Sequence, residues 1–153
     1  MATYWMLVSS EENFERSRAR GFDIAGMKSR HRKKAERVQP GDKVIFYLTK
    51  VQAFGGIAKA TSTFFESEEP VWDGGKKGDL YPFRFEVRPD VICEAGDFLA
   101  VEPIRHKLQH LKKWPDEHWR LAFQGNVHSL PKEDYETIRA LLAKHVGKRT
   151  KVG

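Results

Sequence analysis

The chain has 153 residues, 40% of them hydrophobic and 12% aromatic, which is enough to fill one hydrophobic core but too short for two independent domains. No stretch approaches the ~20 apolar residues of a membrane span, and the start has neither a basic leader nor a small-residue cleavage site, so we expect a cytoplasmic protein without a membrane partner. The single cysteine, Cys93, excludes an internal disulfide, and we expect it to be buried or on an edge strand.

The N-terminal part of the chain predicts a strand followed by a helix. Residues 4–9 form an apolar run that is rich in strand-forming side chains. Ser9 and Glu12 have the spacing of a capping box, in which two side chains bond the first backbone N–H groups of a helix. We therefore expect a helix over residues 11–20 that is ended by Gly21.

The next segment predicts a basic helix or turn and then two strands. An irregular stretch over residues 22–29 leads into the basic segment, which runs to Val38 and is stopped by Gln-Pro-Gly-Asp at 39–42. Residues 43–49 are apolar on both faces, as in a central strand. Residues 53–62 predict another strand, in which two consecutive glycines indicate a bulge or a sharp coil.

The second half of the chain combines short strands and helices. The clearest strand signal lies over residues 83–88, where apolar and charged side chains alternate, so one face should be wet. A turn over 94–97 and a short strand over 98–101 follow. Apolar side chains at helical spacing then predict a short helix and, after Pro131, a final amphipathic helix. The two sets are Ile104, Leu108 and Leu111, and Tyr135, Ile138, Leu141 and Leu142.

Strands dominate the middle of the chain and helices flank it, without the regular alternation of a doubly wound fold. The predicted fold class is therefore α+β, a single domain built on a curled sheet or barrel. The residues after His145 are expected to form a frayed basic tail. This divides the chain into a domain over residues 1–145 and a flexible tail over 146–153.

The positive charge of the chain is concentrated in one segment. The net charge is +6, and residues 16–37 contain nine Lys or Arg against two acids, whereas the rest has 18 basic and 19 acidic residues. A local excess of this kind is typical of a surface that contacts phosphates, although a solvated helix face can carry the same pattern. The candidate phosphate-binding residues are Arg16, Arg18, Arg20, Arg30, Arg32, Lys33 and Lys34.

Sequence motifs for catalysis and metal binding are absent. The chain contains no P-loop, no GxSxG elbow, no HExxH and no CxxC. His106 and His110 are four residues apart, but no carboxylate or cysteine completes a set of zinc ligands, so we expect no metal and no other cofactor. The sequence therefore favours a binding protein over an enzyme.

The tryptophans give the better functional signal. Trp72 lies in a long polar loop over residues 66–79, where its face would suit stacking on an unpaired base. A tryptophan in a loop is equally suited to anchoring the loop to the core, and the sequence does not separate the two roles. Trp5, inside an apolar run, is expected in the core. For Trp114 and Trp119 both packing and binding are open.

Several segments resemble, in order and spacing, an EVE domain of the PUA-like superfamily. They are YWMLVSSEENF, GMKSRHRKKAERVQPGDKVIFYLT, AFGGIAKATS, the YPF before the alternating strand, and WRLAFQGNVHSLPKEDYETI. The resemblance runs from Tyr4 to Leu142. EVE domains are similar to YTH domains, and both are curled β-barrels, flanked by helices, that hold a flipped modified base in an aromatic pocket. The resemblance therefore implies a nucleic-acid partner, RNA or DNA, and no cofactor.

The resemblance also implies which residues form the base pocket. Polar side chains at the end of the first strand would bond the base, Phe22 and Trp72 would form its walls, and Lys28 would lie on the rim. Relatives often have a tryptophan where this chain has Phe22, so a cage of two tryptophans is not expected. The full set is Ser9, Ser10, Asn13, Phe22, Lys28, Ser29, Trp72, Gln124, Gly125 and Asn126.

Two other functions remain open from the sequence. ASCH domains are also PUA-like, and some act on nucleosides or RNA with a GxKxxExR-like signature. Gly26 and Lys28 match the beginning of that signature, but His31 stands where the acidic partner is expected, which removes the obvious general acid or base. A pocket sized for a base would also suit a small molecule or a protein segment.

Overall fold

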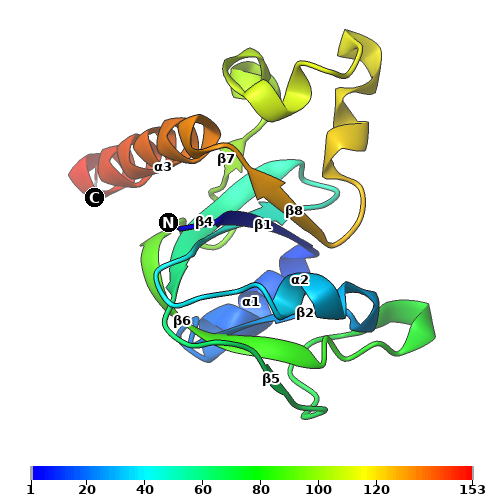
Figure 1. Ribbon diagram of the computed structural model, residues 1–153. Helices are drawn as coiled ribbons and strands as arrows, with labels where there is room; N and C mark the ends of the chain where they lie inside the picture. Colours follow the sequence, from blue (N-terminus) through cyan, green and yellow to red (C-terminus); the bar gives the residue numbers. More distant parts are fainter. Residues whose placement is uncertain (1, 153) are drawn as a thin grey trace.

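The computed structural model describes the backbone of residues 2–152 and the side chains of residues 2–147. The described residues form one curled eight-stranded sheet with the order β2-β6-β4-β3-β1-β8, in which β5 also pairs with β6 and β7 with β4 (Figure 1). Helices cover both faces, which confirms the predicted α+β class and the single curled domain. The strands are β1 (Tyr4–Ser9), β2 (Ile24–Met27), β3 (Lys43–Leu48), β4 (Ala53–Ala60), β5 (Phe65–Glu66), β6 (Phe83–Ile92), β7 (Leu99–Ala100) and β8 (Val127–Leu130).

The first crossover of the chain carries most of the elements that matter for function. Because β1 and β3 are parallel, the connection between them must return from one end of the sheet to the other. It contains α1 (Glu11–Ala19), β2, the 3-10 turn η1 (Ser29–His31) and α2 (Arg32–Ala35), and therefore the whole basic segment. β3 lies between β1 and β4, which confirms the central strand predicted over residues 43–49.

The two faces of the sheet bury two separate hydrophobic cores. On one face, Ile45 and Tyr47 pack with α3 (Lys132–Val152) and the 3-10 helices that precede β8. On the other face, Val44 and Phe46 pack with α1, β2 and β6. We call the first face the outer face and the second the inner face, because the sheet curls around α1 and α2 (Figure 1).

The paired glycines of β4 form a bulge, as predicted. Phe46 pairs with Gly56 and Tyr47 with Phe54, which leaves Gly55 as the extra residue. A Cβ on Gly55 would lie 2.8 Å from the ring of Phe14 in α1. Glycine therefore lets α1 pack closely on the inner face.

The start of α1 differs from the prediction by one residue. Ser10 is the N-cap, and its hydroxyl accepts a hydrogen bond from the N–H of Asn13 at 3.1 Å. Ser9 instead belongs to β1 and donates its hydroxyl to the carbonyl of Ser10. The predicted capping box of Ser9 and Glu12 is therefore wrong. Gly21 follows the helix in the left-handed conformation, with φ 74°, as expected for a helix end.

Other local predictions were overturned by tertiary packing. Residues 24–27, within the stretch expected to be irregular, form the edge strand β2 beside β6. Arg84, expected on the wet face of its strand, is 1% exposed. The single short helix expected around Ile104 and Leu108 is a series of 3-10 helices, η3 (Glu102–Lys107), η4 (Gln109–Leu111) and η5 (Asp116–Phe123).

The final helix begins after Pro131, as predicted, and Tyr135, Ile138 and Leu142 pack into the outer core. The helix α3 runs to Val152, through the residues 146–152 for which a frayed tail is expected. The side chains from residue 148 on lie outside the described residues.

Asp42 fixes the beginning of the sheet from a buried position. Its carboxylate accepts hydrogen bonds from the N–H of Thr3 at 2.9 Å, the indole N–H of Trp5 at 2.9 Å and the N–H of Gln39 at 3.0 Å. Trp5 itself is 1% exposed, which confirms it as a core residue. One carboxylate thus joins the N-terminus, the inner core and the turn before β3.

Cys93 directly follows β6 and is fully buried, as predicted. Burial raises the pKa of its thiol to about 11. The carbonyl of Cys93 accepts a hydrogen bond from Nη2 of Arg18 at 2.7 Å, which joins α1 to the end of β6.

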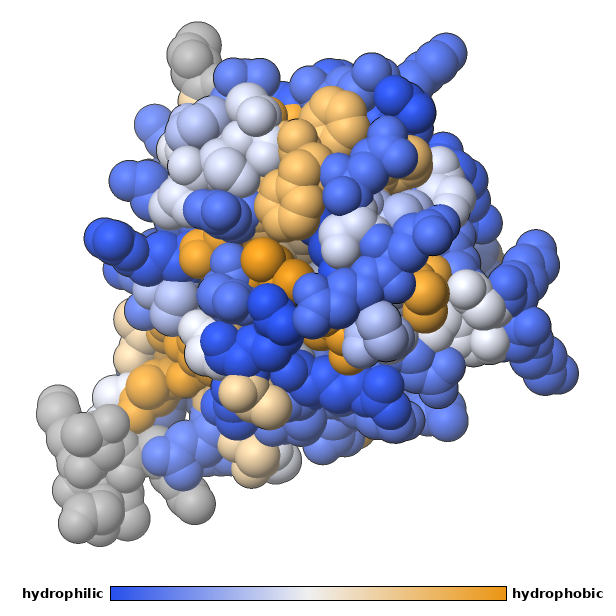
Figure 2. Space-filling view, turned by 90° about the horizontal axis from the view of Figure 1, so that it is seen from below, coloured by the Kyte–Doolittle hydropathy of each residue, from blue (hydrophilic) through white to orange (hydrophobic). Residues whose placement is uncertain are grey.

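The surface seen from below is mainly hydrophilic, with apolar side chains gathered in a band across it (Figure 2). Among the described residues, the large hydrophobic side chains that are exposed are Val51, Phe65 and Leu121. None of the described helices combines the length and the apolar character needed to cross a membrane.

Candidate nucleic-acid interface

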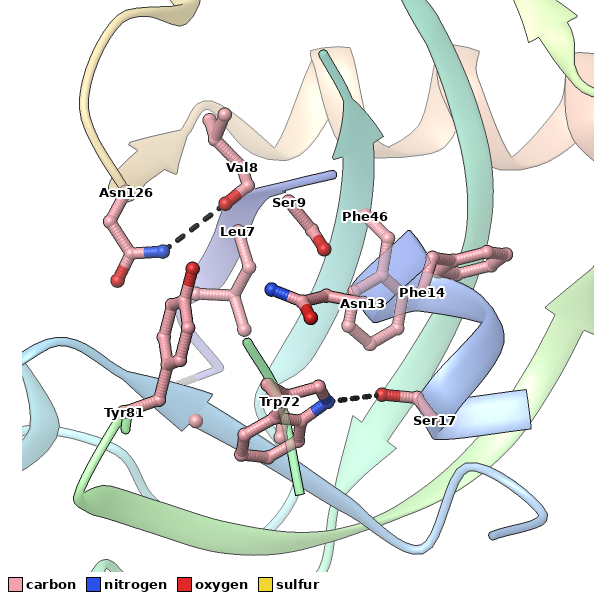
Figure 3. A pocket seen from close by; sticks show the side chains of 12 residues that line it. Leu7, Val8, Ser9, Asn13, Phe14, Ser17, Phe46, Trp72, Tyr81 and Asn126 are labelled. Carbon is pink, nitrogen blue, oxygen red and sulfur yellow. Dashed lines mark hydrogen bonds between the residues drawn. The ribbon is translucent and has the colours of Figure 1, made fainter. Parts of the chain in front are cut away.

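A pocket opens where the end of β1 meets α1, β2 and the loop between β5 and β6 (Figure 3). Its empty volume is about 370 Å³, including the part that is open to solvent. Apolar side chains form most of its wall, with amides and hydroxyls between them. The lining residues are Leu7, Val8, Ser9, Asn13, Phe14, Ser17, Ala25, Gly26, Phe46, Trp72, Tyr81 and Asn126.

Trp72 forms one wall of this pocket and is also fixed to the core. Its side chain is 6% exposed although its loop is polar. The indole N–H donates to Oγ of Ser17 at 2.9 Å, and the ring of Tyr81 meets the indole edge-on with centroids 5.8 Å apart. Of the two roles that the sequence leaves open, the structure shows that Trp72 anchors its loop to the core, and the anchored indole also lines the pocket.

Gly26 makes room for this arrangement from the facing strand β2. A Cβ at Gly26 would lie 2.7 Å from Cζ3 of Trp72 and 3.0 Å from Cβ of Tyr81. Any side chain here would therefore push one of the two rings out of place. Sequence reasoning treats Gly26 only as part of a signature, because its role depends on a tryptophan that lies far along the chain.

Two side chains hold the loop that carries Trp72. The Asn13 amide forms a pair of hydrogen bonds with the backbone of Asp73, accepting from its N–H at 2.8 Å and donating to its carbonyl at 2.9 Å. Arg84 donates from Nε to the carbonyl of Tyr81 at 3.1 Å and from Nη2 to that of Leu80 at 3.1 Å. Its other bonds go to the carbonyl of Glu69 and to Oγ of Ser67.

Arg84 also supports Trp72 directly, since its guanidinium lies 5.1 Å from the centre of the indole ring. Burial lowers the pKa of this guanidinium, while the charge of Glu69 acts in the opposite direction. Arg84 is therefore a positioning residue for the pocket wall.

Tyr81 forms the opposite side of the pocket and is a residue that sequence reasoning missed. Its backbone is left-handed, with φ 54°, a conformation that costs about 1 to 3 kcal/mol for a bulky residue and is often found at functional sites. Burial raises the pKa of its phenol, and the Asn13 side chain acts in the opposite direction. The only sequence signal was its place in the YPF segment.

Asn126 closes the pocket from the strand β8 side. Its Nδ2 donates to the carbonyl of Val8 at 3.2 Å, and its Oδ1 accepts from the N–H of Lys28 at 3.0 Å. This side chain thereby joins the end of β1 to the end of β2. Lys28 lies at the rim, with Nζ 5.6 Å from the centre of the Tyr81 ring.

The structure brings Ser9, Asn13, Trp72 and Asn126 together in the pocket, leaves Lys28 at its rim and places the other five predicted pocket residues elsewhere. Phe22 packs in the inner core against Phe14 and is 5% exposed. The remaining four are Ser10, which caps α1, Ser29, whose N–H donates to Asp79, and Gln124 and Gly125, which line a separate hollow with Tyr47 and Arg120.

The basic segment separates into two groups. Four of the seven candidate phosphate-binding residues have acidic partners at 2.6 to 4.0 Å. These are Arg16 with Glu12, Arg18 with Glu15, Arg20 with Asp23 and Glu69, and Arg32 with Glu36 and Glu66. Arg30, Lys33 and Lys34 have no such partner among the described side chains, so they carry the uncompensated charge.

Two histidines adjoin these unpaired cations. Burial, and then the charges of Lys34, Arg30, His128 and Lys28, lower the pKa of His31. Burial also lowers the pKa of His128, together with His110, Lys34 and Lys113, against the effect of its hydrogen bond to the Gln124 carbonyl. We call this group of basic side chains, which reaches the pocket through Lys28, the basic rim. It consists of Lys28, Arg30, His31, Lys34, Lys113 and His128.

No group of three or more His, Cys, Asp or Glu side chains within residues 2–147 is placed to hold a metal ion. His106 and His110, the pair with the spacing of metal ligands, lie on the separate 3-10 helices η3 and η4. The pocket is lined by aromatic rings, amides and hydroxyls, which are groups that bind by stacking and hydrogen bonding.

Comparisons with known proteins agree with this architecture. The EVE domain model matches residues 3–141. UPF0310 proteins of Pyrococcus abyssi and Pyrococcus horikoshii are 26% and 28% identical, and each alignment covers 92% of this chain and 99% of the relative.

Among solved structures, a complex of the YTH domain-containing protein mmi1 with RNA has a TM-score of 0.70 at 13% identity, covering 98% of this chain and 87% of that one. The YTH domain of Zygosaccharomyces rouxii MRB1, in complex with N6-methyladenosine RNA, has a TM-score of 0.65 at 16% identity, covering 92% and 86%. Both share the curled sheet with its flanking helices, as the resemblance in the sequence implies. Because the EVE model matches nearly the whole chain, this protein belongs to the EVE domain family.

Proposed function

We propose that the protein is an RNA-binding module that captures one extruded base, modified or unmodified, in the Trp72 pocket while the basic rim holds the adjoining phosphates. The observation that carries the proposal is the direct junction of the two surfaces at Lys28. Its backbone N–H is bound to the pocket residue Asn126, and its ammonium lies beside Tyr81. Stacking pockets that adjoin a cationic track are typical of proteins that bind single-stranded nucleic acid.

The chemistry of the lining suits a base better than it suits a reaction. The Asn13 amide and the Tyr81 hydroxyl point into the pocket from two sides (Figure 3), where the edge of a base would meet hydrogen-bonding groups. Tyr81 is the one titratable side chain in the lining, and its raised pKa keeps it neutral at physiological pH. This supports a binding role over acid-base catalysis.

The similar YTH domains that were solved with RNA make RNA the first ligand to test, and the one solved with N6-methyladenosine RNA makes that base the first modification. The screen uses matched RNA and DNA oligonucleotides, each with and without N6-methyladenine or 5-methylcytosine, at fixed salt. Saturable 1:1 binding with a preference for RNA is expected. Absence of binding to every oligonucleotide would contradict the proposed function.

The contribution of the pocket is measured with Trp72→Phe and the matched control Trp114→Phe, since Trp114 is a partly buried tryptophan outside the pocket. A base stack is worth about 1 to 3 kcal/mol when removed entirely, so the smaller phenyl ring should weaken binding by a few-fold to about tenfold. Trp114→Phe should leave the affinity unchanged. If wild type and Trp72→Phe bind with equal affinity and melt at equal temperatures, Trp72 does not contribute to binding.

The contribution of the basic rim is measured as a salt dependence. Replacing Arg30, Lys34 and Lys113 with Gln should reduce the slope of log K against log salt by about 2, because each phosphate contact on a single strand contributes about 0.7. The control replaces Arg16, Arg20 and Arg32, which carry the same charge but have acidic partners. A larger change of slope in the control than in the rim variant would assign the phosphate contacts to Arg16, Arg20 and Arg32 instead.

A further inference from the structure

The outer face of the sheet carries a straight row of cations. In the strand register, Lys43 of β3 pairs directly with Lys59 of β4, and Lys59 pairs directly with Arg88 of β6. Residues in direct register project to the same face of a sheet, with strands about 4.8 Å apart. The three side chains therefore start from one line that spans about 10 Å across three neighbouring strands.

This row lies on the opposite face from the Trp72 pocket. Lys43 and Lys59 have the same orientation as Ile45 and Ile57, two residues away on their strands, and both isoleucines belong to the outer core. Val87, which neighbours Arg88, belongs to the inner core, so Arg88 also faces outwards. The row and the pocket are thus on opposite faces of the sheet.

The row has no compensating charge. None of its three side chains has an ion-pair partner among the described residues, and Lys59 and Arg88 are exposed. Two acids lie close to the row in sequence, and both have other partners: Asp90 binds Arg139 through two hydrogen bonds of 2.9 and 3.0 Å, and the Asp42 carboxylate accepts three hydrogen bonds. Like charges that face one another across strands destabilise a sheet.

The cations border a hollow against the first turns of α3. Its empty volume is about 670 Å³, including the part open to solvent, and its lining consists of Lys43, Lys59, Arg88, Pro89, Asp90, Tyr135 and Arg139. Four cations and one acid thus surround a concave surface. The ring of Tyr135, which packs on the ring of Tyr4, forms a flat wall of this surface. A compact polyanion placed there would relieve the repulsion within the row.

We propose that this hollow is a second anion site, distinct from the Trp72 pocket, which binds two or three adjacent phosphate groups. The spacing suits consecutive phosphates, because each of the three strands offers one cation and the side chains can converge on neighbouring oxygens. The phosphates can belong to a short polyphosphate, free or on a nucleotide, or to the backbone of a nucleic-acid strand. The site does not depend on the proposed capture of a base.

The test is titration calorimetry of the full chain with sodium tripolyphosphate. It compares wild type, the row variant Lys43→Gln/Lys59→Gln/Arg88→Gln and a control variant with the same loss of charge. The control is Lys107→Gln/Lys112→Gln/Lys144→Gln, three exposed lysines outside the hollow. We expect one tripolyphosphate per wild-type chain, a loss of affinity of about 30-fold or more in the row variant, and less than about threefold in the control, because charged hydrogen bonds dominate such sites.

The melting temperature distinguishes a binding role of the three row cations from a structural role. Without anion, the row variant should melt at the same temperature as wild type or higher, since it removes like-charge repulsion. With tripolyphosphate, wild type and control should melt higher and the row variant should not. Equal losses of affinity in the row and control variants would overturn the site and indicate diffuse charge.

A second titration identifies the source of the phosphates. If tripolyphosphate does not bind wild type but the row variant binds a 20-nucleotide RNA more weakly than the control does, the site holds nucleic-acid backbone. If neither tripolyphosphate nor RNA distinguishes the row variant from the control, the proposal is wrong. Trp72→Phe should bind tripolyphosphate with the affinity of wild type. A result that contradicts the base pocket is therefore distinguishable from a result that contradicts this anion site.

Discussion

Arg84→Met tests whether a buried arginine builds the base pocket. The substitution keeps an unbranched side chain but removes the donors to the carbonyls of Glu69, Leu80 and Tyr81 and to Ser67. The loss of four hydrogen bonds at about 1 kcal/mol each lowers the free energy of unfolding, and removal of the buried charge recovers part of this loss. The free energy of unfolding should therefore fall by about 3 kcal/mol. For a chain of this size that is a decrease in melting temperature of about 6 to 12 °C.

Urea unfolding followed by circular dichroism measures the global loss, and Arg88→Met is the matched control, because Arg88 lies on the same strand and is exposed. Amide hydrogen exchange measures the local effect. The N–H of Asp73, which is bonded to Asn13, should lose protection as the loop over residues 67–82 loosens. Unchanged stability together with unchanged exchange in this loop would refute the positioning role, and a loss of stability with normal exchange would place Arg84 in the core only.

Three further predictions concern the pocket, the core and the rim. Gly26→Ala should displace Trp72, destabilise the fold by about 1 to 3 kcal/mol and weaken oligonucleotide binding, whereas Gly147→Ala, where a Cβ meets open space, should do neither in the same melting and binding measurements. Asp42→Asn should cost about 2 to 3 kcal/mol in urea unfolding, because an NH₂ group then faces at least one of the three N–H donors that the carboxylate now accepts from; Asp116→Asn, at an exposed position, should cost far less. Because the pKa values of His31 and His128 are lowered in the folded state, these histidines take up protons at a higher pH in the unfolded chain than in the folded protein. Stability should therefore decline as the pH falls through the ordinary histidine value of 6.5, down to the lower folded values, while RNA binding should become tighter. His31→Gln/His128→Gln should flatten both pH profiles, and unchanged profiles would contradict the assignment.

The sequence predicted those helices and strands whose residues follow a regular apolar pattern. β1, β3, the bulge of β4, α1 and the final helix all follow from local periodicity, glycine and proline, because these signals act over a few residues. β2 has four residues, one of them a glycine, so no alternation of apolar and polar side chains predicts this strand. The segment after β7 has the apolar spacing of an α-helix but forms separate 3-10 helices, the last of which begins after Pro115.

The candidate site was predictable only where a residue carries its own signal. Trp72 stands out by its place in a polar loop, and Asn13 and Asn126 entered through the family resemblance. Arg84 was assigned to a wet face because alternation along a strand contains no information about a loop that folds over it. Tyr81 and Gly26 were missed for the same reason, since their roles arise from contact with Trp72, which is distant in sequence.

The buried thiol of Cys93 gives the protein an internal reporter of its own opening. A thiol reacts as the thiolate, and with a pKa near 11 and no exposure Cys93 is protected from aromatic disulfide reagents in the closed fold. Because the Cys93 side chain packs in the outer core, labelling therefore proceeds only through molecules in which that core has opened. The labelling rate, without any engineered probe, measures how often the outer core opens.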